Sequence, residues 1–436
     1  MIRPAIALEY QKADLPDRSK TYVRVFHQGH GFFWTCAVVT LLLNLLLPVS
    51  AQGAEGAYDQ AECLAEDGQP NLDVPNLAMN CPDLYAWLQF IEVNTPATGH
   101  PDAVTWELWA TDPLTFPAKP APKRCERQRS SGCPVWPTSV VQTDTLLPSK
   151  RNPTLHPPSL RASVTANAGS GNGVPDDLGA IATETIRRNR ASFDYIVAHD
   201  LWYQEGLAAR FKEGFKIDFP LESVELKLNW LPMKYVKDPS RYFTTVIDGE
   251  LQGLVAMHVS TKTLPNWFWS TFEHVDNPGR CDYIGCYDAF GSEPRWIPEK
   301  EALQTRYPAG RLTPALERLM GQAKLDPVFQ NYRLKGSQTD FTDSMGSATL
   351  LGNSVTEYGF VPTASCITCH GRAGVDWNGK KPANLRIFGE KLSGQTFNGP
   401  LDSELFYEGN DPSRRYLMQV DFVWAIPFRA QPIGGK

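Results

Sequence analysis

The sequence predicts an α+β fold: a helical N-terminal region, a small antiparallel sheet with a long covering helix, and an irregular C-terminal segment. Apolar residues at helical spacing predict one long helix over residues 178–212. Residues 224–230 alternate strictly between apolar and polar side chains, which is typical of a strand with one buried face. Asp248-Gly249 lies between two further strand-like segments and indicates a β-hairpin. A small sheet packed against the long helix accounts for these patterns together.

Composition changes along the chain divide it into segments. The N-terminal region is predicted to contain a helix beginning at Asn80-Cys81-Pro82, because the apolar residues that follow fall on one helical face. Ser, Thr, Pro and Gly then dominate a stretch too long to be an ordinary connection within a domain. The predicted segments are an export signal (1–51), a partly helical region with disulfides (52–136), a flexible loop or linker (137–177), an α+β region (178–350) and a C-terminal segment (351–436).

The N-terminus has the pattern of an export signal. A basic stretch precedes the apolar run 32–47, and Val49-Ser50-Ala51 provides a small-residue cleavage site. The run is short for a spanning helix, although an uncleaved membrane anchor is the alternative. We expect a periplasmic protein with no membrane span once the signal is removed. The net charge of −6 disfavours nucleic acid as a partner.

The cysteines favour the same compartment. Of the nine, Cys36 lies in the predicted signal and two belong to a C-x-x-C-H motif. The other six form an even set, which in an exported chain predicts disulfides. Pairing between sequence neighbours is the simplest of the possible connectivities. The alternative, in which Cys281 and Cys286 form half of a metal site, lacks a second cysteine pair. The expected bonds are Cys63–Cys81, Cys125–Cys133 and Cys281–Cys286.

Cys366-Ile-Thr-Cys369-His370 is the motif that carries chemistry. Covalent attachment of haem c requires two thiols at this spacing, and the following imidazole provides the proximal iron ligand. A thioredoxin-like pair does not require the histidine, and a zinc site would need two further ligands. The motif therefore predicts one covalently bound haem c, with Cys366 and Cys369 as anchors and His370 on the iron.

The ligand opposite His370 determines what such a haem can do. Met418 is the only methionine after the motif, and His258 and His274 are the upstream alternatives. A closed six-coordinate iron favours electron transfer, whereas an open position permits ligand chemistry. The candidate aromatic residues of the haem wall are Trp377, Phe422 and Trp424.

The sequence Glu273-His274-Val-Asp276 is the one compact ionisable cluster with the composition for acid–base chemistry. The same three residues can simply cap the end of a strand, and we favour that interpretation.

Several stretches of the chain resemble a family of exported bacterial cytochrome c family proteins. The matching stretches are 86–94, 106–109, 253–258, 267–277, 351–354, 365–373 and 421–424. The resemblance implies haem binding and electron transfer, without an established substrate. Pro362 before the motif and Pro427 near the C-terminus disfavour the two terminal helices of a small cytochrome c. We therefore expect the haem to pack against the preceding α+β region.

The sequence thus predicts a periplasmic monohaem protein that passes single electrons to or from a redox partner protein. One alternative is a peroxidase-like or oxidase-like enzyme with an open iron position. Another is a haem-bearing sensor or binding protein. No pattern in the sequence indicates an oligomeric state.

Overall fold

The computed structural model describes residues 60–65, 68–125, 131–141, 147–148, 174–301, 304–382, 385 and 398–434. All of them belong to one unit of the chain, Ala54–Lys436. The predicted export signal and most of the predicted linker (142–146 and 149–173) lie outside the described residues.

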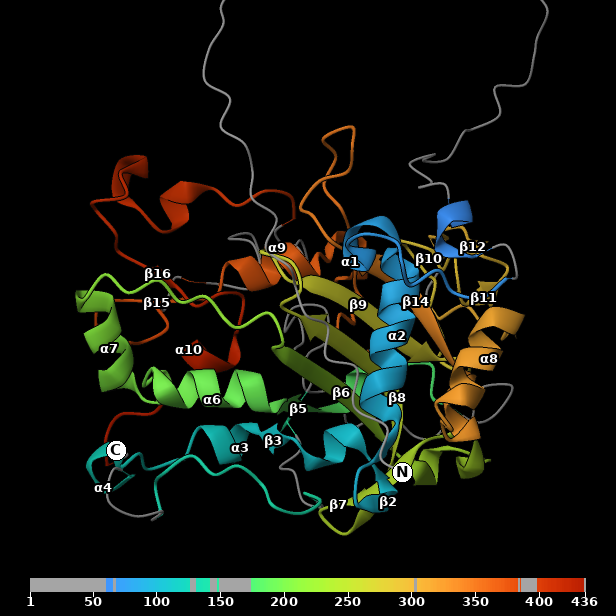
Figure 1. Ribbon diagram of the computed structural model, residues 1–436, viewed down its shortest axis with the longest axis horizontal. Helices are drawn as coiled ribbons and strands as arrows, with labels where there is room; N and C mark the ends of the chain where they lie inside the picture. Colours follow the sequence, from blue (N-terminus) through green and yellow to red (C-terminus); the bar gives the residue numbers. More distant parts are fainter. Residues whose placement is uncertain are drawn as a thin grey trace, which may run out of the picture. The chain divides into compact units, whose positions relative to one another are not determined.

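One antiparallel sheet of eight strands forms the centre of this unit (Figure 1). The main path of the sheet is β14-β9-β8-β6-β5-β3, while β7 pairs with β8 and β4 pairs with β5. The strands are β3 (Ala110–Thr111), β4 (Leu147–Pro148), β5 (Thr183–Arg188), β6 (Val224–Pro232), β7 (Thr244–Ile247), β8 (Glu250–Thr261), β9 (Phe268–His274) and β14 (Tyr332–Gln338). The predicted hairpin is confirmed as β7–β8, with positive φ angles of 51° and 78° at Asp248 and Gly249.

The predicted fold class is wrong, because the described chain is mostly sheet with only a few short helices. The sheet is large instead of small, and the described residues contain no long helix that covers it. Residues 178–212 form α5 (Leu178–Ile181), strand β5, α6 (Arg190–Ala198) and α7 (Gln204–Lys212). The β-branched residues of Thr183-Glu-Thr-Ile186 favour a strand here. Asn189 then begins α6 as its N-cap, since its side chain accepts a hydrogen bond from the Ser192 N–H.

The N-terminal region is also less helical than predicted. Its helix α2 (Pro82–Asn94) begins where expected, but no other helix in the described part of residues 60–141 exceeds four residues. Frequent prolines between residues 96 and 122 account for the difference, because proline does not support a helix interior. The short elements are η1 (Gln60–Cys63), α1 (Leu77–Asn80), β1 (Pro96–Ala97), β2 (His100–Val104), η2 (Thr105–Leu108), α3 (Asp112–Thr115) and α4 (Pro122–Cys125).

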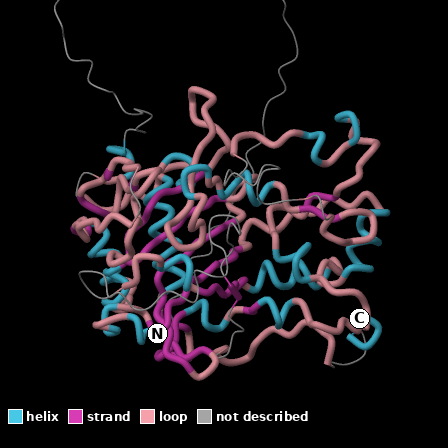
Figure 2. Tube along the Cα trace, turned by 180° about the vertical axis from the view of Figure 1, so that it is seen from behind, coloured by secondary structure: helices cyan, strands magenta, loops and turns pink. Residues whose placement is uncertain are grey.

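Loops make up a large share of the remaining chain (Figure 2). The elements after β6 that lie outside the sheet are short. They are η4 (Met233–Tyr235), η5 (Pro239–Arg241), β10 (Cys286–Tyr287), β11 (Ser292–Glu293), β12 (Trp296–Ile297), β13 (Arg311–Leu312), α8 (Pro314–Gln322), η6 (Pro327–Asn331), η7 (Val361–Thr363), α9 (Cys366–Gly371), β15 (Gly374–Val375), η8 (Ser403–Leu405), η9 (Glu408–Asn410), β16 (Met418–Gln419) and α10 (Ala425–Arg429). No helix in the described residues is long and apolar enough to cross a membrane.

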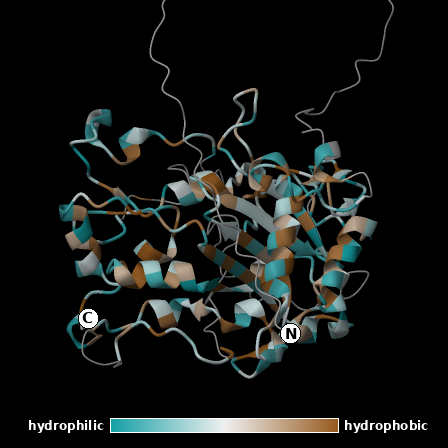
Figure 3. Cartoon of the chain, in the orientation of Figure 1, coloured by the Kyte–Doolittle hydropathy of each residue, from teal (hydrophilic) through white to brown (hydrophobic). Residues whose placement is uncertain are grey.

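The two faces of the sheet differ in polarity because side chains alternate along each strand. Leu226 and Leu228 of β6 belong to the apolar core that also contains residues of α2 and α8, and Trp87 of α2 contacts Phe272 of β9. Figure 3 shows hydrophobic and hydrophilic residues mixed along the central strands. We call the opposite side, on which polar side chains of β6, β8 and β9 are buried or partly buried, the polar face. Its members are Glu225, Lys227, Asn229, His258, Ser260, Thr271 and Glu273.

The predicted disulfides are confirmed. The structure contains Cys63–Cys81, Cys125–Cys133 and Cys281–Cys286, which are the three sequence-neighbour pairs. Three disulfides are typical of a protein that folds in an oxidising compartment.

Asp83, in the first turn of α2, predicts a pH dependence of stability. Burial and the nearby Asp288 carboxylate raise the pKa of Asp83 from 3.8 to about 7. The folded chain therefore binds a proton more tightly than the unfolded chain, so this group loses stabilising effect as the pH rises from about 4 to 7.

We expect Asp83→Asn to remove this loss of stability. Asparagine can keep both present contacts, the Ala289 N–H and the Ser337 hydroxyl. The free energy of unfolding of the variant, relative to the wild type, should rise between pH 4 and 8 by up to a few kcal/mol, because one pKa unit corresponds to about 1.4 kcal/mol. Urea unfolding across this pH range measures the difference. The exposed Asp102→Asn should run parallel to the wild type, and parallel curves for Asp83→Asn would contradict the prediction.

Candidate functional site

The C-x-x-C-H motif forms the six-residue helix α9 at one end of the sheet (Figure 1). The chain enters it from the short 3-10 helix η7, which contains Pro362, so no long helix leads into the motif, as predicted. Near the C-terminus, α10 is present despite Pro427 but has only five residues. Cys366 is buried and Cys369 is partly buried, and neither forms a disulfide, whereas the other six described cysteines are paired.

A cavity of about 50 Å³ lies between α9 and the polar face of the sheet. The motif contributes Cys366, Cys369 and His370, and the sheet contributes His258. The structure thus brings His258 to the same cavity as the motif, although the two are far apart in the sequence. The other lining residues are Glu225, Lys227, Ser260, Trp269, Leu351, Thr356, Glu357, Phe360, Ala364 and Ser365.

The register of the central strands determines which side chains reach this cavity. Lys227 of β6 pairs with His258 of β8, so their side chains are neighbours on the polar face. Two pairs further along the same strands, and so on the same face, Glu225 lies opposite Ser260, which in turn lies opposite Trp269 of β9. All five side chains line the cavity. A one-residue shift in register would turn His258 to the apolar core.

His370 is oriented by a backbone carbonyl. Its Nδ1 lies 2.8 Å from the Phe422 oxygen, so Nδ1 carries the proton and donates it to that carbonyl. Nε2 is then the unprotonated nitrogen, as required for a metal ligand. The Trp269 ring packs beside the imidazole, with ring centroids 4.6 Å apart.

His258 has two polar partners on residues 351–365, the segment that covers the polar face of the sheet. Its Nε2 lies 3.1 Å from Nδ2 of Asn353 and 3.4 Å from a carboxylate oxygen of Glu357. Burial alone would raise the pKa of Glu357, but the charges of His258 and Lys227 and the Asn353 N–H outweigh it and lower the pKa. Burial opposes the charge on Lys227, yet Glu184 and Glu357 raise its pKa. The cavity wall thus places the oppositely charged side chains of Lys227 and Glu357 beside the imidazole of His258.

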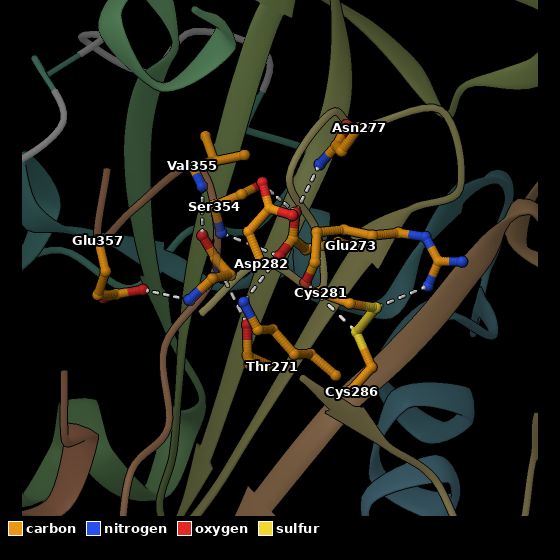
Figure 4. A network of polar contacts seen from close by, with 12 residues as sticks. Thr271, Glu273, Asn277, Cys281, Asp282, Cys286, Ser354, Val355 and Glu357 are labelled. Atoms are coloured by element: carbon orange, nitrogen blue, oxygen red, sulfur yellow. Dashed lines mark hydrogen bonds and ion pairs between the residues drawn. A yellow bond between two sulfur atoms is a disulfide. The ribbon is translucent and has the colours of Figure 1, made fainter. Parts of the chain in front are cut away.

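A network of buried polar contacts holds this covering segment against the sheet (Figure 4). The carboxylate of Glu273 accepts hydrogen bonds from the backbone N–H and the hydroxyl of Ser354 and from the Asn277 amide. The Lys335 ammonium lies 3.8 Å from the same carboxylate. Asn353 also donates to the Thr271 hydroxyl at 3.0 Å, next to its contact with His258. The network therefore fixes the segment that carries Glu357.

His274 does not line the cavity, and its contacts are those of a buried structural residue. It is fully buried, stacks on Tyr242 with ring centroids 3.8 Å apart, and its Nε2 lies 3.0 Å from the Arg241 carbonyl. Its Nδ1 accepts from the Asp276 N–H, and burial lowers the pKa of His274 to about 4. Glu273 belongs to the polar face instead, so the sequence cluster divides between the two sides of the strand. These contacts are those of a residue capping a strand end.

The other predicted residues are not among those that line the cavity. Met418 lies in strand β16, opposite Val375, within an apolar cluster. Phe422 and Trp424 contact the motif without lining the cavity. The Phe422 carbonyl accepts from His370, and the Trp424 indole donates to the Cys369 carbonyl at 2.9 Å. Trp377 is 69% exposed.

Sequence patterns missed the charged and aromatic residues of the cavity wall. Lys227, Trp269, Glu357 and Phe360 all line it. The alternation in residues 224–230 was the available signal. Polar side chains on one face of a central strand need polar partners or a polar cavity beside them. No local pattern indicates which segment covers that face.

No family model matches the sequence, and comparisons with curated proteins and with solved structures give no significant match. Among the described residues, no three His, Cys, Asp or Glu side chains are arranged to hold a metal ion by themselves.

Proposed function

We propose that this protein is a periplasmic monohaem c-type cytochrome-like protein that transfers single electrons. The observation that carries the proposal is the cavity that has Cys366, Cys369 and His370 on one side and His258 on the other. A haem bound there would supply a one-electron redox couple.

The residues of the chain fit this group. Two cysteines outside the disulfides have the spacing required for thioether bonds, and the Phe422 carbonyl leaves His370 Nε2 as the ligand atom. Leu351 and Phe360 are buried apolar walls that exclude water. Lys227 provides a positive charge that can pair with a carboxylate of the ligand.

His258 is the residue best placed to be the distal ligand, since among the three candidates only it lines the cavity. To ligate through Nε2, it would exchange its contacts with Asn353 and Glu357 for the iron. The disulfides support the proposed export to the periplasm, where c-type haem is attached. A redox partner protein completes the proposed role.

A second candidate function is favoured by the contact between His258 and Glu357. If His258 keeps this contact in the haem-loaded protein, the iron position stays open. The pair then has the composition of a general acid–base beside the iron. In that case the protein is a haem-dependent peroxidase-like or oxidase-like enzyme.

The test is expression of the full chain with its signal in cells that attach c-type haem. We expect haem that stays with the polypeptide on a denaturing gel, and a low-spin spectrum that does not change with carbon monoxide. The variant with both Cys366→Ser and Cys369→Ser is the matched control and should lose covalent haem. Wild-type protein without covalent haem would overturn the proposal. Rapid carbon monoxide binding by haem-loaded protein would favour the enzyme.

A further inference from the structure

Two successive residues, the second of which contacts His370 of the motif, have a left-handed backbone. Asp421 has a φ of 47° and Phe422 a φ of 69°, although neither is glycine. L-residues other than glycine, asparagine and aspartate seldom adopt this region, so the surroundings must hold it. Such conformations concentrate at functional sites.

The Asp421 carboxylate is the anchor of this turn. One oxygen accepts from the Lys262 ammonium at 2.8 Å and from the Trp267 indole at 3.3 Å. The other accepts from the Phe219 backbone N–H at 2.7 Å. Lys262, which follows strand β8, is buried and also donates to the Pro265 carbonyl. Asp421 is therefore fixed to two segments that are distant from it in the sequence, one at Phe219 and one at residues 262–267.

This turn determines the direction of one carbonyl. The Phe422 oxygen, one residue after the anchor, accepts from His370 Nδ1. A normal right-handed or extended backbone at residues 421–422 would direct that carbonyl elsewhere, because φ and ψ set its orientation. The His370 ring then would lose the partner that selects its tautomer.

We propose that Asp421, held by Lys262, is a positioning residue for His370. It fixes the Phe422 carbonyl so that Nδ1 of His370 holds the proton and Nε2 faces the cavity. The inference rests on the proposed function, because the orientation of His370 matters for function only if His370 is an iron ligand. The orientation of the ring can nevertheless be measured without haem.

The first measurement uses the haem-free full chain and nitrogen NMR of the His370 ring. We expect the wild type to show the Nδ1-protonated tautomer alone. Asp421→Ala, which removes all the anchoring contacts, should give a mixture of tautomers. Asp421→Asn should lie between them, because asparagine keeps two acceptor contacts and tolerates a positive φ. Asp218→Ala is the matched control, since Asp218 also contacts Lys262 at 3.0 Å but is exposed.

The second measurement uses the haem-loaded chain and its reduction midpoint potential. A hydrogen bond from Nδ1 makes the imidazole a stronger donor, which favours oxidised iron. We therefore expect a higher potential for Asp421→Ala, a smaller rise for Asp421→Asn and none for Asp218→Ala.

The outcomes separate the two proposals. A wild type that takes up no haem contradicts the proposed function, while the NMR result still tests the positioning of His370. A single Nδ1 tautomer in the folded Asp421→Ala chain would overturn the positioning role. If Asp421→Ala does not fold, an Asp421→Asn chain with the wild-type tautomer and potential overturns it equally.

Discussion

Replacing His258 with alanine is expected to change the haem-loaded protein from low-spin to high-spin. His258 is the only one of the three distal candidates in the cavity that contains the motif. Without its imidazole the iron has no sixth ligand from the chain, and a five-coordinate iron binds added ligands. The absorption spectrum should shift accordingly, and carbon monoxide should bind within the mixing time.

Two matched variants make the experiment decisive. Met418→Leu keeps the volume of a side chain in the apolar cluster and should leave the spectrum unchanged. Glu357→Gln should retain the low-spin spectrum, because Glu357 contacts His258 but is not expected to bind iron. If Met418→Leu abolishes the low-spin form and His258→Ala does not, the distal assignment is wrong.

Asp112→Ala is expected to cause a large loss of stability. Asp112 accepts from the fully buried guanidinium of Arg188 at 2.5 Å and from Arg429 of α10 at 2.9 Å. Removing one partner of a buried ion pair typically costs about 3–5 kcal/mol, since an uncompensated charge stays in the interior. The Glu225 carboxylate, 3.4 Å from Arg188, offsets part of the loss and places the expected value near the lower limit.

Chemical denaturation of the haem-free chain measures this effect. The control is Asp194→Ala, which breaks the exposed pair with Arg190 on α6. An exposed pair at this spacing contributes about 0.3–0.5 kcal/mol. Equal effects of the two substitutions would show that the buried pair does not stabilise the fold. Replacing Arg188 and Asp112 together by apolar residues should restore part of the loss.

Local patterns were sufficient for features whose residues are neighbours in sequence. The C-x-x-C-H motif, the β7–β8 hairpin and the three disulfides are of this kind, and the last two are confirmed. The beginning of α2 at Pro82 was predicted for the same reason.

Features that depend on strand pairing could not be predicted. Segment 178–212 was interpreted as one helix because its apolar residues have nearly helical spacing, whereas pairing with β6 makes Thr183–Arg188 a strand. Nothing local indicates that Lys227 and His258 are neighbours, since only the register of β6 and β8 places them together. Glu357 reaches the same cavity because the segment that carries it is held by Glu273 and Thr271.

The burial of Cys366 has a consequence for the order of events during maturation. In the folded chain Cys366 is 8% exposed, and its sulfur lies 3.3 Å from the Leu351 carbonyl oxygen. A sulfur in that position is shielded from any enzyme that would have to bring a haem to it. If haem is attached as proposed, its attachment to Cys366 would therefore have to precede the packing of this residue into the folded chain.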